Sequence, residues 1–139
     1  MSGLSYKDMT TWRLQAKKLI KKVSFDTNYK PEVINPVDYF NFETPPRYQS
    51  DREVMNYDLH HVETSDLIVV NLSQLNSSIG TIIELYRAYQ LGIPVIAFGY
   101  MTEYDHLHSW IKCCITRVEK NLENVANYIY EFYRRKKRR

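Results

Sequence analysis

The chain has 139 residues, enough for one domain with a real core but not for two. Hydrophobic residues make up 44% and aromatic residues 14%, a composition that excludes an intrinsically disordered protein. The formal charge of +3 depends on the six basic residues 134–139, so residues 1–133 alone are slightly acidic. We therefore take 1–133 as the domain and 134–139 as a basic tail. A solvated chain end is the preferred interpretation of the tail, with a nucleic-acid or membrane-surface contact as the alternative.

The two cysteines, Cys113 and Cys114, are neighbours in the sequence. A disulfide between them would be strained, and they lack the CxxC spacing of zinc and redox sites. We interpret them as buried thiols in a reducing compartment. The chain has no run of eighteen apolar residues and no apolar signal core at its start, so we expect a soluble, cytoplasmic protein.

The first half of the chain contains two predicted helices and two predicted strands. Residues 5–23 have the apolar stripe of an amphipathic helix: Trp12, Ala16, Leu19, Ile20 and Val23. Residues 32–36, EVINP, indicate a short strand ended by proline, and residues 48–64 a second helix. Residues 66–72, DLIVVNL, form the β-branched run of a strand covered on both faces.

The second half continues the alternation. We expect a helix over 79–91 ended by Gly92, a buried strand over 94–99 and a third strand over 113–118. The final helix has one apolar face: Leu122, Val125, Ala126, Ile129, Tyr130 and Tyr133. Strands that alternate with helices predict an α/β fold, a single doubly wound parallel sheet of the Rossmann-like or flavodoxin-like type, flanked by helices.

The segment NSSIGTIIE, residues 76–84, joins a predicted strand to a predicted helix. Ligands of open parallel sheets gather at such loops, and the free N–H groups of a helix start stabilise an anion. Ser77 or Ser78 could add a hydroxyl donor, although the residues alone favour simple capping of the helix. Glu84, placed near the first turn, either complements the helix dipole or takes part in chemistry.

An acid–base reaction would need a second carboxylate. The candidates are Asp58, which lies among polar neighbours in MNYDLHHVETS, and Asp66, which opens a strand and could be a turn residue. Residue types and spacing alone do not assign a reaction to either of them.

Several blocks of sequence, taken in order, extend this interpretation. They are MSGLSYKDMTTWR, INPVDYF, DLHHVETSDLIVVNL and SIGTIIELYRAYQLGIPVIAF. Together they resemble the nucleoside 2-deoxyribosyltransferase family, which includes the 2′-deoxynucleoside 5′-phosphate N-hydrolases, over residues 1 to about 112. Because each block is short, their order and spacing carry the resemblance.

The resemblance implies roles for the two acids. Glu84 falls on the family's nucleophile, which attacks the anomeric carbon, and Asp58 on the residue that handles the proton of the departing base. Asp66 is then structural. The implied chemistry is that of a retaining glycosidase with a covalent glycosyl–glutamate intermediate.

Ser78 separates two branches of the family. Its transferases resemble one another in having aspartate there to hold the 5′-hydroxyl, whereas the nucleotide hydrolases have serine, which does not repel a 5′-phosphate. Ser78 and Gly80 would bind the phosphate, and the implied reaction is hydrolysis of a (deoxy)nucleoside 5′-monophosphate to free base and sugar 5-phosphate. Base exchange between nucleosides and non-catalytic nucleotide binding remain the alternatives.

The chain begins within the family's phosphate loop, so the predicted sheet lacks the family's first strand. Ser2 and Gly3 would be the remnant of that loop. In the family a neighbouring subunit lends a polar residue to the pocket, and His108 or Ser109 falls there, although an exposed loop histidine and a helix cap are the simpler interpretations.

We therefore expect a homodimer or a higher homo-oligomer, with a nucleotide or nucleoside as substrate and without a membrane or nucleic-acid partner. No cofactor is expected. No metal is expected either, because the four histidines have no ligand spacing. The preferred base and the type of sugar are not predicted.

Overall fold

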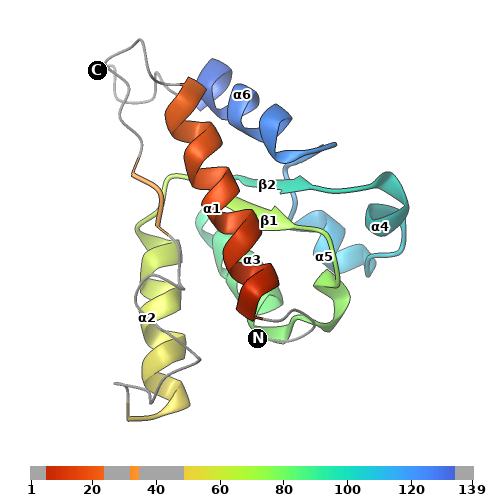
Figure 1. Cartoon of the computed structure of the whole chain (residues 1–139). Helices are drawn as coiled ribbons and strands as arrows, with labels where there is room; N and C mark the ends of the chain where they lie inside the picture. Colours follow the sequence, from red (N-terminus) through yellow and green to blue (C-terminus); the bar gives the residue numbers. More distant parts are fainter. Residues whose placement is uncertain (1–5, 24–31, 35–48, 134–139) are drawn as a thin grey trace.

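The computed structural model describes residues 6–23, 32–34 and 49–133, and the statements below concern these residues (Figure 1). The predicted phosphate-loop remnant, Ser2 and Gly3, and the basic tail lie outside them. Residues 35–36 of the predicted first strand also lie outside the described part.

Helices and strands alternate along most of the described chain. The helices are α1 (Tyr6–Val23), α2 (Asp51–Glu63), α3 (Ile79–Leu91), α4 (Met101–Asp105), α5 (Ser109–Cys113) and α6 (Leu122–Tyr133), with a 3-10 turn, η2 (Leu75–Ser77). The strands are β1 (Ile68–Asn71), β2 (Val95–Phe98) and β3 (Arg117–Glu119).

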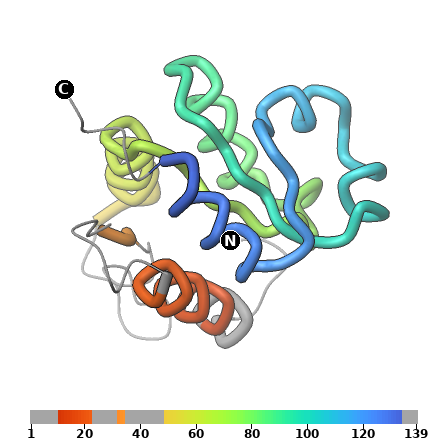
Figure 2. The backbone as a smooth tube through the Cα atoms, turned by 90° about the horizontal axis from the view of Figure 1, so that it is seen from above, coloured from red at the N-terminus to blue at the C-terminus, as the bar shows by residue number. Residues whose placement is uncertain are grey.

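The three strands form one parallel sheet in the order β1-β2-β3. Ile68 of β1 pairs with Val95 of β2, and Ile96 pairs with Arg117 of β3. Helices α1 and α6 cover one face of the sheet, and α2, α3 and α5 cover the other (Figures 1 and 2). The predicted fold class, an α/β parallel sheet flanked by helices on both faces, is confirmed.

Strand β2 divides the core into two halves because successive side chains of a strand point to opposite faces. Val95 and Ala97 belong to the cluster formed with α3 and α5, whereas Ile96 and Phe98 belong to the cluster formed with α1 and α6. All four residues of β2 are buried, so β2 is the centre of the described sheet.

Most of the predicted elements are present. The predicted helices over 5–23, 48–64 and 79–91 correspond to α1, α2 and α3, and the predicted strands over 66–72 and 94–99 contain β1 and β2. Gly92 ends α3 in the left-handed conformation, with φ of 72°. A glycine adopts this conformation without a steric penalty, which is why it ended the predicted helix at the right residue.

Four predictions were wrong in part. Residues 32–34 are not in a strand, and the predicted strand over 113–118 is helical at its start, because α5 ends at Cys113 and β3 begins only at Arg117. Cys113 is exposed and Cys114 half-buried, so they are not a pair of buried thiols. In β1 only Val70 is buried, so its coverage is less complete than predicted.

The short helices α4 and α5 and the turn η2 were not predicted. Each is too short to show a helical period in the sequence. In α5, Ile111 is buried in the same cluster as Leu107, which holds the segment against the sheet. Burial of these two side chains therefore stabilises the segment, which the predicted strand over 113–118 overlaps only at Cys113.

Candidate active site

The loop that follows β1 is held firmly before α3 begins. Leu72 and Leu75 are almost completely buried, and the Ser73 N–H donates to Asn71 Oδ1 at 2.9 Å. Between them Gln74 has a positive φ of 58°, a left-handed conformation that is uncommon for a residue other than glycine. These contacts therefore fix the position at which α3 begins, beyond the carboxyl end of β1.

The serines before α3 do not cap it with their side chains. Ser78 occupies the N-cap position, but its hydroxyl bonds to Thr81 Oγ1 at 2.9 Å, and the Ser77 hydroxyl donates to the Gln74 carbonyl at 3.0 Å. The capping interpretation is therefore wrong for both. The first N–H groups of α3 have no intrahelical acceptors by helix geometry. Among the residues that the structure describes, a Cβ added at Gly80 would meet nothing within 4 Å, so these residues leave the start of the helix open.

Glu84 lies in the second turn of α3, and the first turn contains no acidic residue. The helix-dipole explanation of Glu84 is thus weaker than its predicted place suggested, because that effect falls off within the first turn. Glu84 is half-buried. Burial, and the neighbouring Asp58 carboxylate, raise the pKa of Glu84 to about 7, while Arg13 opposes the rise.

Asp58 reaches the same place from α2. Burial raises the pKa of Asp58, and the nearby His61 and Arg13 lower it. Asp58 Oδ1 is buried and has no hydrogen-bond partner among the described residues. A buried carboxylate oxygen left in this state is uncommon, and a substrate group is one explanation of it. The structure thus brings together Glu84 and Asp58, the two acids singled out in the sequence.

The third charged group of the site, Arg13, was missed in the sequence. It lies on α1, is half-buried, and interacts electrostatically with Glu84 and, less strongly, with Asp58. Its position in the sequence could have indicated burial. Arg13 shares the apolar face of its helix with Ala16 and Ile20, at i+3 and i+7, whereas a solvated arginine is expected on the other face.

His108 ends the loop before α5 and Ser109 is the first residue of α5, next to the loop before α3. The Asn76 side chain joins the two loops: its Nδ2 donates to the His106 carbonyl at 2.9 Å, and its Oδ1 accepts from the His108 N–H at 3.2 Å. His108 is exposed and caps α5, since its Nδ1 accepts from the Trp110 N–H. Ser109, an exposed first residue of α5, is not the cap.

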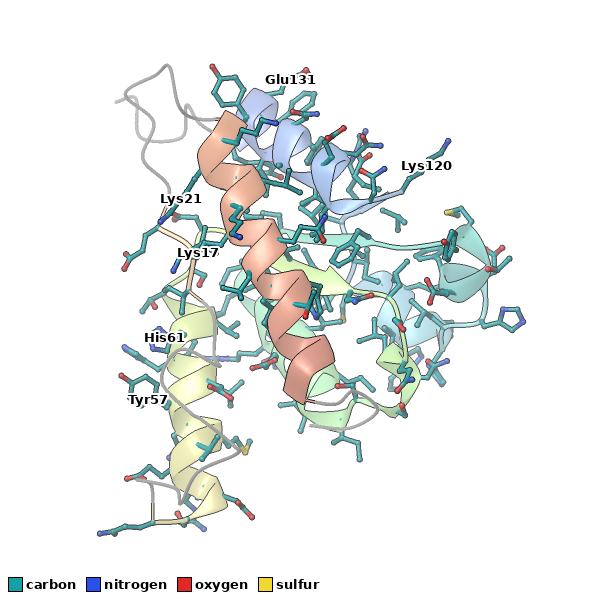
Figure 3. The ribbon with its side chains drawn as sticks, viewed as in Figure 1. Lys17, Lys21, Tyr57, His61, Lys120 and Glu131 are labelled. Atoms are coloured by element: carbon teal, nitrogen blue, oxygen red, sulfur yellow. The ribbon has the colours of Figure 1, made fainter. Side chains whose placement is uncertain are left out.

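Other features of the described surface do not include the two acids. Asp66 is exposed before β1, as a structural residue can be. An open hollow of about 480 Å³ runs along α2, and its lining contains neither Asp58 nor Glu84: Ser50, Arg52, Glu53, Asn56, Tyr57 and His60. The Tyr57 and His61 rings lie on the same helix with their centres 4.9 Å apart and are tilted by 39° to each other (Figure 3). In the described residues no group of three or more histidine, cysteine, aspartate or glutamate side chains could hold a metal ion.

Comparison with known proteins identifies the family. A family model described as nucleoside 2-deoxyribosyltransferase matches residues 7–125, which include Arg13, Asp58, Ser78 and Glu84. No curated protein and no solved structure matches the chain significantly. Within the described ranges, none of the helices is both long and apolar enough to cross a membrane. The chain belongs to the nucleoside 2-deoxyribosyltransferase family and is an enzyme of the type that acts on the N-glycosidic bond of nucleosides.

Proposed function

We propose that the protein hydrolyses the N-glycosidic bond of a (deoxy)nucleoside 5′-monophosphate and releases the free base and the sugar 5-phosphate. The observation that carries the proposal is the carboxylate pair. Glu84 and Asp58 come from two helices, both with a raised pKa, and lie close to the open N-terminus of α3. Two carboxyl groups with different tasks are what a retaining glycosidase needs.

In the proposed reaction Glu84 is the nucleophile and Asp58 the general acid. The Glu84 carboxylate forms an ester bond to the anomeric carbon while the carbon–nitrogen bond breaks, and Asp58 gives its proton to the departing base. Water then attacks the same carbon, Asp58 takes a proton from it, and Glu84 leaves as a carboxylate. The unpartnered Oδ1 of Asp58 supports this role, because it is available to a group of the substrate.

The 5′-phosphate would bind at the start of α3. The N–H groups there carry a partial positive charge, and Gly80 leaves room for the phosphate to approach. Ser78 adds a neutral hydroxyl that does not cap the helix. We place His108 and Ser109 at the rim of this site, on the loop that Asn76 holds, and Ser2 and Gly3 as further phosphate contacts.

Base exchange between nucleosides is the alternative reaction of the same family. It would use the same two acids, with a second base in place of water. Ser78 favours hydrolysis, since a carboxylate at that position would suit a neutral 5′-hydroxyl and a hydroxyl suits a phosphate. A nucleotide-binding protein without turnover is a third possibility, and it predicts binding with no products.

Product analysis separates these functions. The protein is incubated with a panel of deoxyribonucleoside and ribonucleoside 5′-monophosphates and the matching nucleosides, with and without a second free base, and the products are resolved by chromatography. Free base from a monophosphate, without an added base, is the expected result. Products that require the second base indicate exchange, and binding without products would exclude both enzymes.

Two substitutions test the assigned roles. Glu84→Gln should leave less than a tenth of the turnover while the substrate still binds, because the amide keeps the shape but loses the nucleophilic charge.

Asp58→Asn should slow the reaction by about 10²–10⁴-fold, as expected for the loss of a general acid. Asp66→Asn is the matched control, since Asp66 is an exposed carboxylate between α2 and β1. Retained turnover in Glu84→Gln would remove Glu84 from its role.

We also propose that the enzyme is a homodimer in the cytoplasm. Large apolar side chains are exposed on α2 and α3, among them Met55, Ile79 and Tyr89, which favours a partner surface. A nucleotide substrate and the exposed free thiol of Cys113 fit a reducing compartment.

A further inference from the structure

The helices α1 and α6 end side by side on one face of the sheet. Trp12, in the first half of α1, packs against Phe98 at the carboxyl end of β2, with ring centres 5.2 Å apart. Helix α1 therefore begins near this end of the sheet and runs away from it. Helix α6 follows β3, which is parallel to β2, and runs the same way. The last turns of both helices lie together, at the end of the molecule away from the start of α3 (Figures 1 and 2).

This end of the molecule is strongly basic. The last two turns of α1 contain three exposed lysines: Lys18, Lys21 and Lys22. Helix α6 ends at Tyr133, and the next six residues, 134–139, are all arginine or lysine. Covalent connection alone keeps these six residues within about 20 Å of Tyr133. Glu131, in the last turn of α6, is an acidic residue at the same end and offsets only one of these charges (Figure 3).

The concentration of positive charge exceeds what the ends of helices require. A lysine or two in the last turn stabilises the C-terminus of a helix through its dipole, as Lys21 and Lys22 do for α1. That effect falls off within one turn, so it does not account for six further basic residues beyond a neighbouring helix. Residues 1–133 are slightly acidic by themselves. The positive excess of the chain is thus concentrated at this end, where a polyanion would stabilise it.

Aromatic side chains of α6 lie beside these cations. The Phe132 ring packs against Tyr128, with ring centres 4.8 Å apart, and Phe132 is 60% exposed. The Cζ atom of Arg117 lies 4.3 Å from the centre of the Tyr128 ring. Exposed aromatic rings beside basic residues suit a single-stranded nucleic acid, because bases stack on the rings while the cations contact phosphates. A bilayer fits less well, since the apolar face of α6 is already buried in the core: Leu122, Val125, Ala126 and Ile129.

We propose that the C-terminal ends of α1 and α6, together with residues 134–139, form a binding surface for the phosphate backbone of a single-stranded nucleic acid. The surface is separate from the candidate active site, and the inference does not rest on the proposed function. Phosphate contacts carry no sequence information, so binding should not depend on the order of the bases. The structure thus favours the alternative interpretation of the basic tail, because it places the lysines of α1 at the same end.

Fluorescence anisotropy with a labelled thymidine oligonucleotide of about 20 nucleotides tests the proposal. Binding by the full chain should weaken steeply between about 50 and 200 mM salt, because log K falls by about 0.7 per phosphate contact for each tenfold rise in salt. Replacement of all six residues 134–139 by glutamine should reduce this slope by about 4, and Lys21→Gln combined with Lys22→Gln by about 1. Phe132→Ser should weaken binding several-fold with little change in the slope.

Arg52→Gln combined with Lys120→Gln is the matched control for the lysine pair. It removes two exposed cations that lie elsewhere, Arg52 in the first turn of α2 and Lys120 before the start of α6 (Figure 3). It should leave both the affinity and the slope nearly unchanged. Circular dichroism checks that each variant is folded. Thymidine 5′-monophosphate, a competitor of the size of the proposed substrate, should not displace the oligonucleotide.

Absence of binding at the lowest salt concentration would overturn the proposal, as would an affinity that does not depend on salt or an equal loss in the control pair. Displacement by the monophosphate would place the oligonucleotide in the candidate active site and also overturn it. A chain that binds vesicles of equal parts phosphatidylserine and phosphatidylcholine, but not the oligonucleotide, would assign the basic end to a membrane surface instead. None of these outcomes bears on the hydrolysis, which product analysis tests separately.

Discussion

At the scale of single residues, Glu84 and Asp58 of the proposed active site lower the stability of the fold when they are ionised. Burial is the main cause that raises the pKa of both acids, so each is harder to ionise in the folded protein than in the unfolded chain. Ionising either acid therefore lowers the free energy of unfolding, which is common for groups at functional sites. In the proposed reaction, the same burial would leave little water to compete with the Glu84 carboxylate for the anomeric carbon.

A first prediction concerns the stability of Glu84→Gln. The pKa of Glu84 rises from 4.5 to about 7 on folding, so the folded protein binds this proton more tightly, and wild-type stability should fall as pH rises through that interval. The amide has no such loss. Thermal unfolding should therefore find Glu84→Gln more stable than wild type by about 1–3 kcal/mol at pH 8, with the advantage nearly gone at pH 5.

Glu123→Gln is the control for that measurement, because Glu123 is an exposed glutamate in the first turn of α6. It should not gain stability between pH 5 and pH 8. A Glu84→Gln variant whose stability follows wild type at every pH would mean that Glu84 is solvated in the folded state.

A second prediction concerns Ser78→Asp. A carboxylate facing a 5′-phosphate repels it, by several kcal/mol when the pair is partly desolvated, whereas a neutral 5′-hydroxyl can donate to it. The ratio of kcat/KM for a nucleotide to that for its matching nucleoside should fall by at least about tenfold. Ser77→Asp, with the same charge one residue earlier, is the control and should change the ratio less. An equal effect of both variants would point to general repulsion at the loop.

At the scale of elements, the loops before α3 and α5 act as one unit because Asn76 joins them. Its two hydrogen bonds reach residues thirty or more positions further along the chain. No local pattern in the sequence reports such a pair. The Asn76 side chain thus helps to hold residues 106–109 beside the proposed phosphate site, together with the buried Leu107.

A third prediction follows for Asn76→Ala. Loss of two hydrogen bonds should lower stability by about 1–2 kcal/mol and free the loop before α5. If His108 and Ser109 contribute to the substrate site, KM should rise several-fold while kcat changes little. Ser77→Ala is the matched control, because the Ser77 hydroxyl donates within its own loop, to the Gln74 carbonyl. An unchanged KM in a destabilised Asn76→Ala would separate the loop from the site.

At the scale of the whole molecule, large apolar side chains are exposed on several elements, α2 and α3 among them. Tyr86 and Tyr89 of α3 are 55% and 57% exposed, and their rings lie 6.2 Å apart. Met55 and Tyr57 of the neighbouring helix α2 are also exposed. Two aromatic side chains with this exposure on one helix face are more typical of an interface than of a free surface.

A fourth prediction is that the chain forms a homodimer in solution through this surface. Sedimentation velocity at micromolar concentration should show a dimer, and Tyr86→Ser combined with Tyr89→Ser should shift it towards monomer. Phe132→Ser on α6, which removes a side chain that is 60% exposed, should leave the dimer intact. A wild-type monomer at these concentrations would contradict the prediction, and a dimer that survives the double change would place the interface elsewhere.

The sequence by itself predicted most of the longer elements of this protein and offered Glu84 and Asp58 as the acids of the proposed site. Apolar periodicity predicted α1, α3 and α6, and Gly92 predicted the end of α3, because these features depend on contacts within a few residues. The blocks of sequence likewise led to the family, which the match over residues 7–125 shows. Asp58 and Glu84 were named before any geometry was known.

Only the tertiary structure decided how far the pKa values of the two acids are raised and which residues lie beside them. The raised pKa values depend on burial, and the meeting of Arg13 with Glu84 depends on helices that are distant in sequence. Helix α5 extends to Cys113, where a strand was expected to begin, and the burial of Leu107 and Ile111 holds this segment against the core. Burial and long-range electrostatics belong to pairs of residues brought together by folding, so no single stretch of sequence contains them.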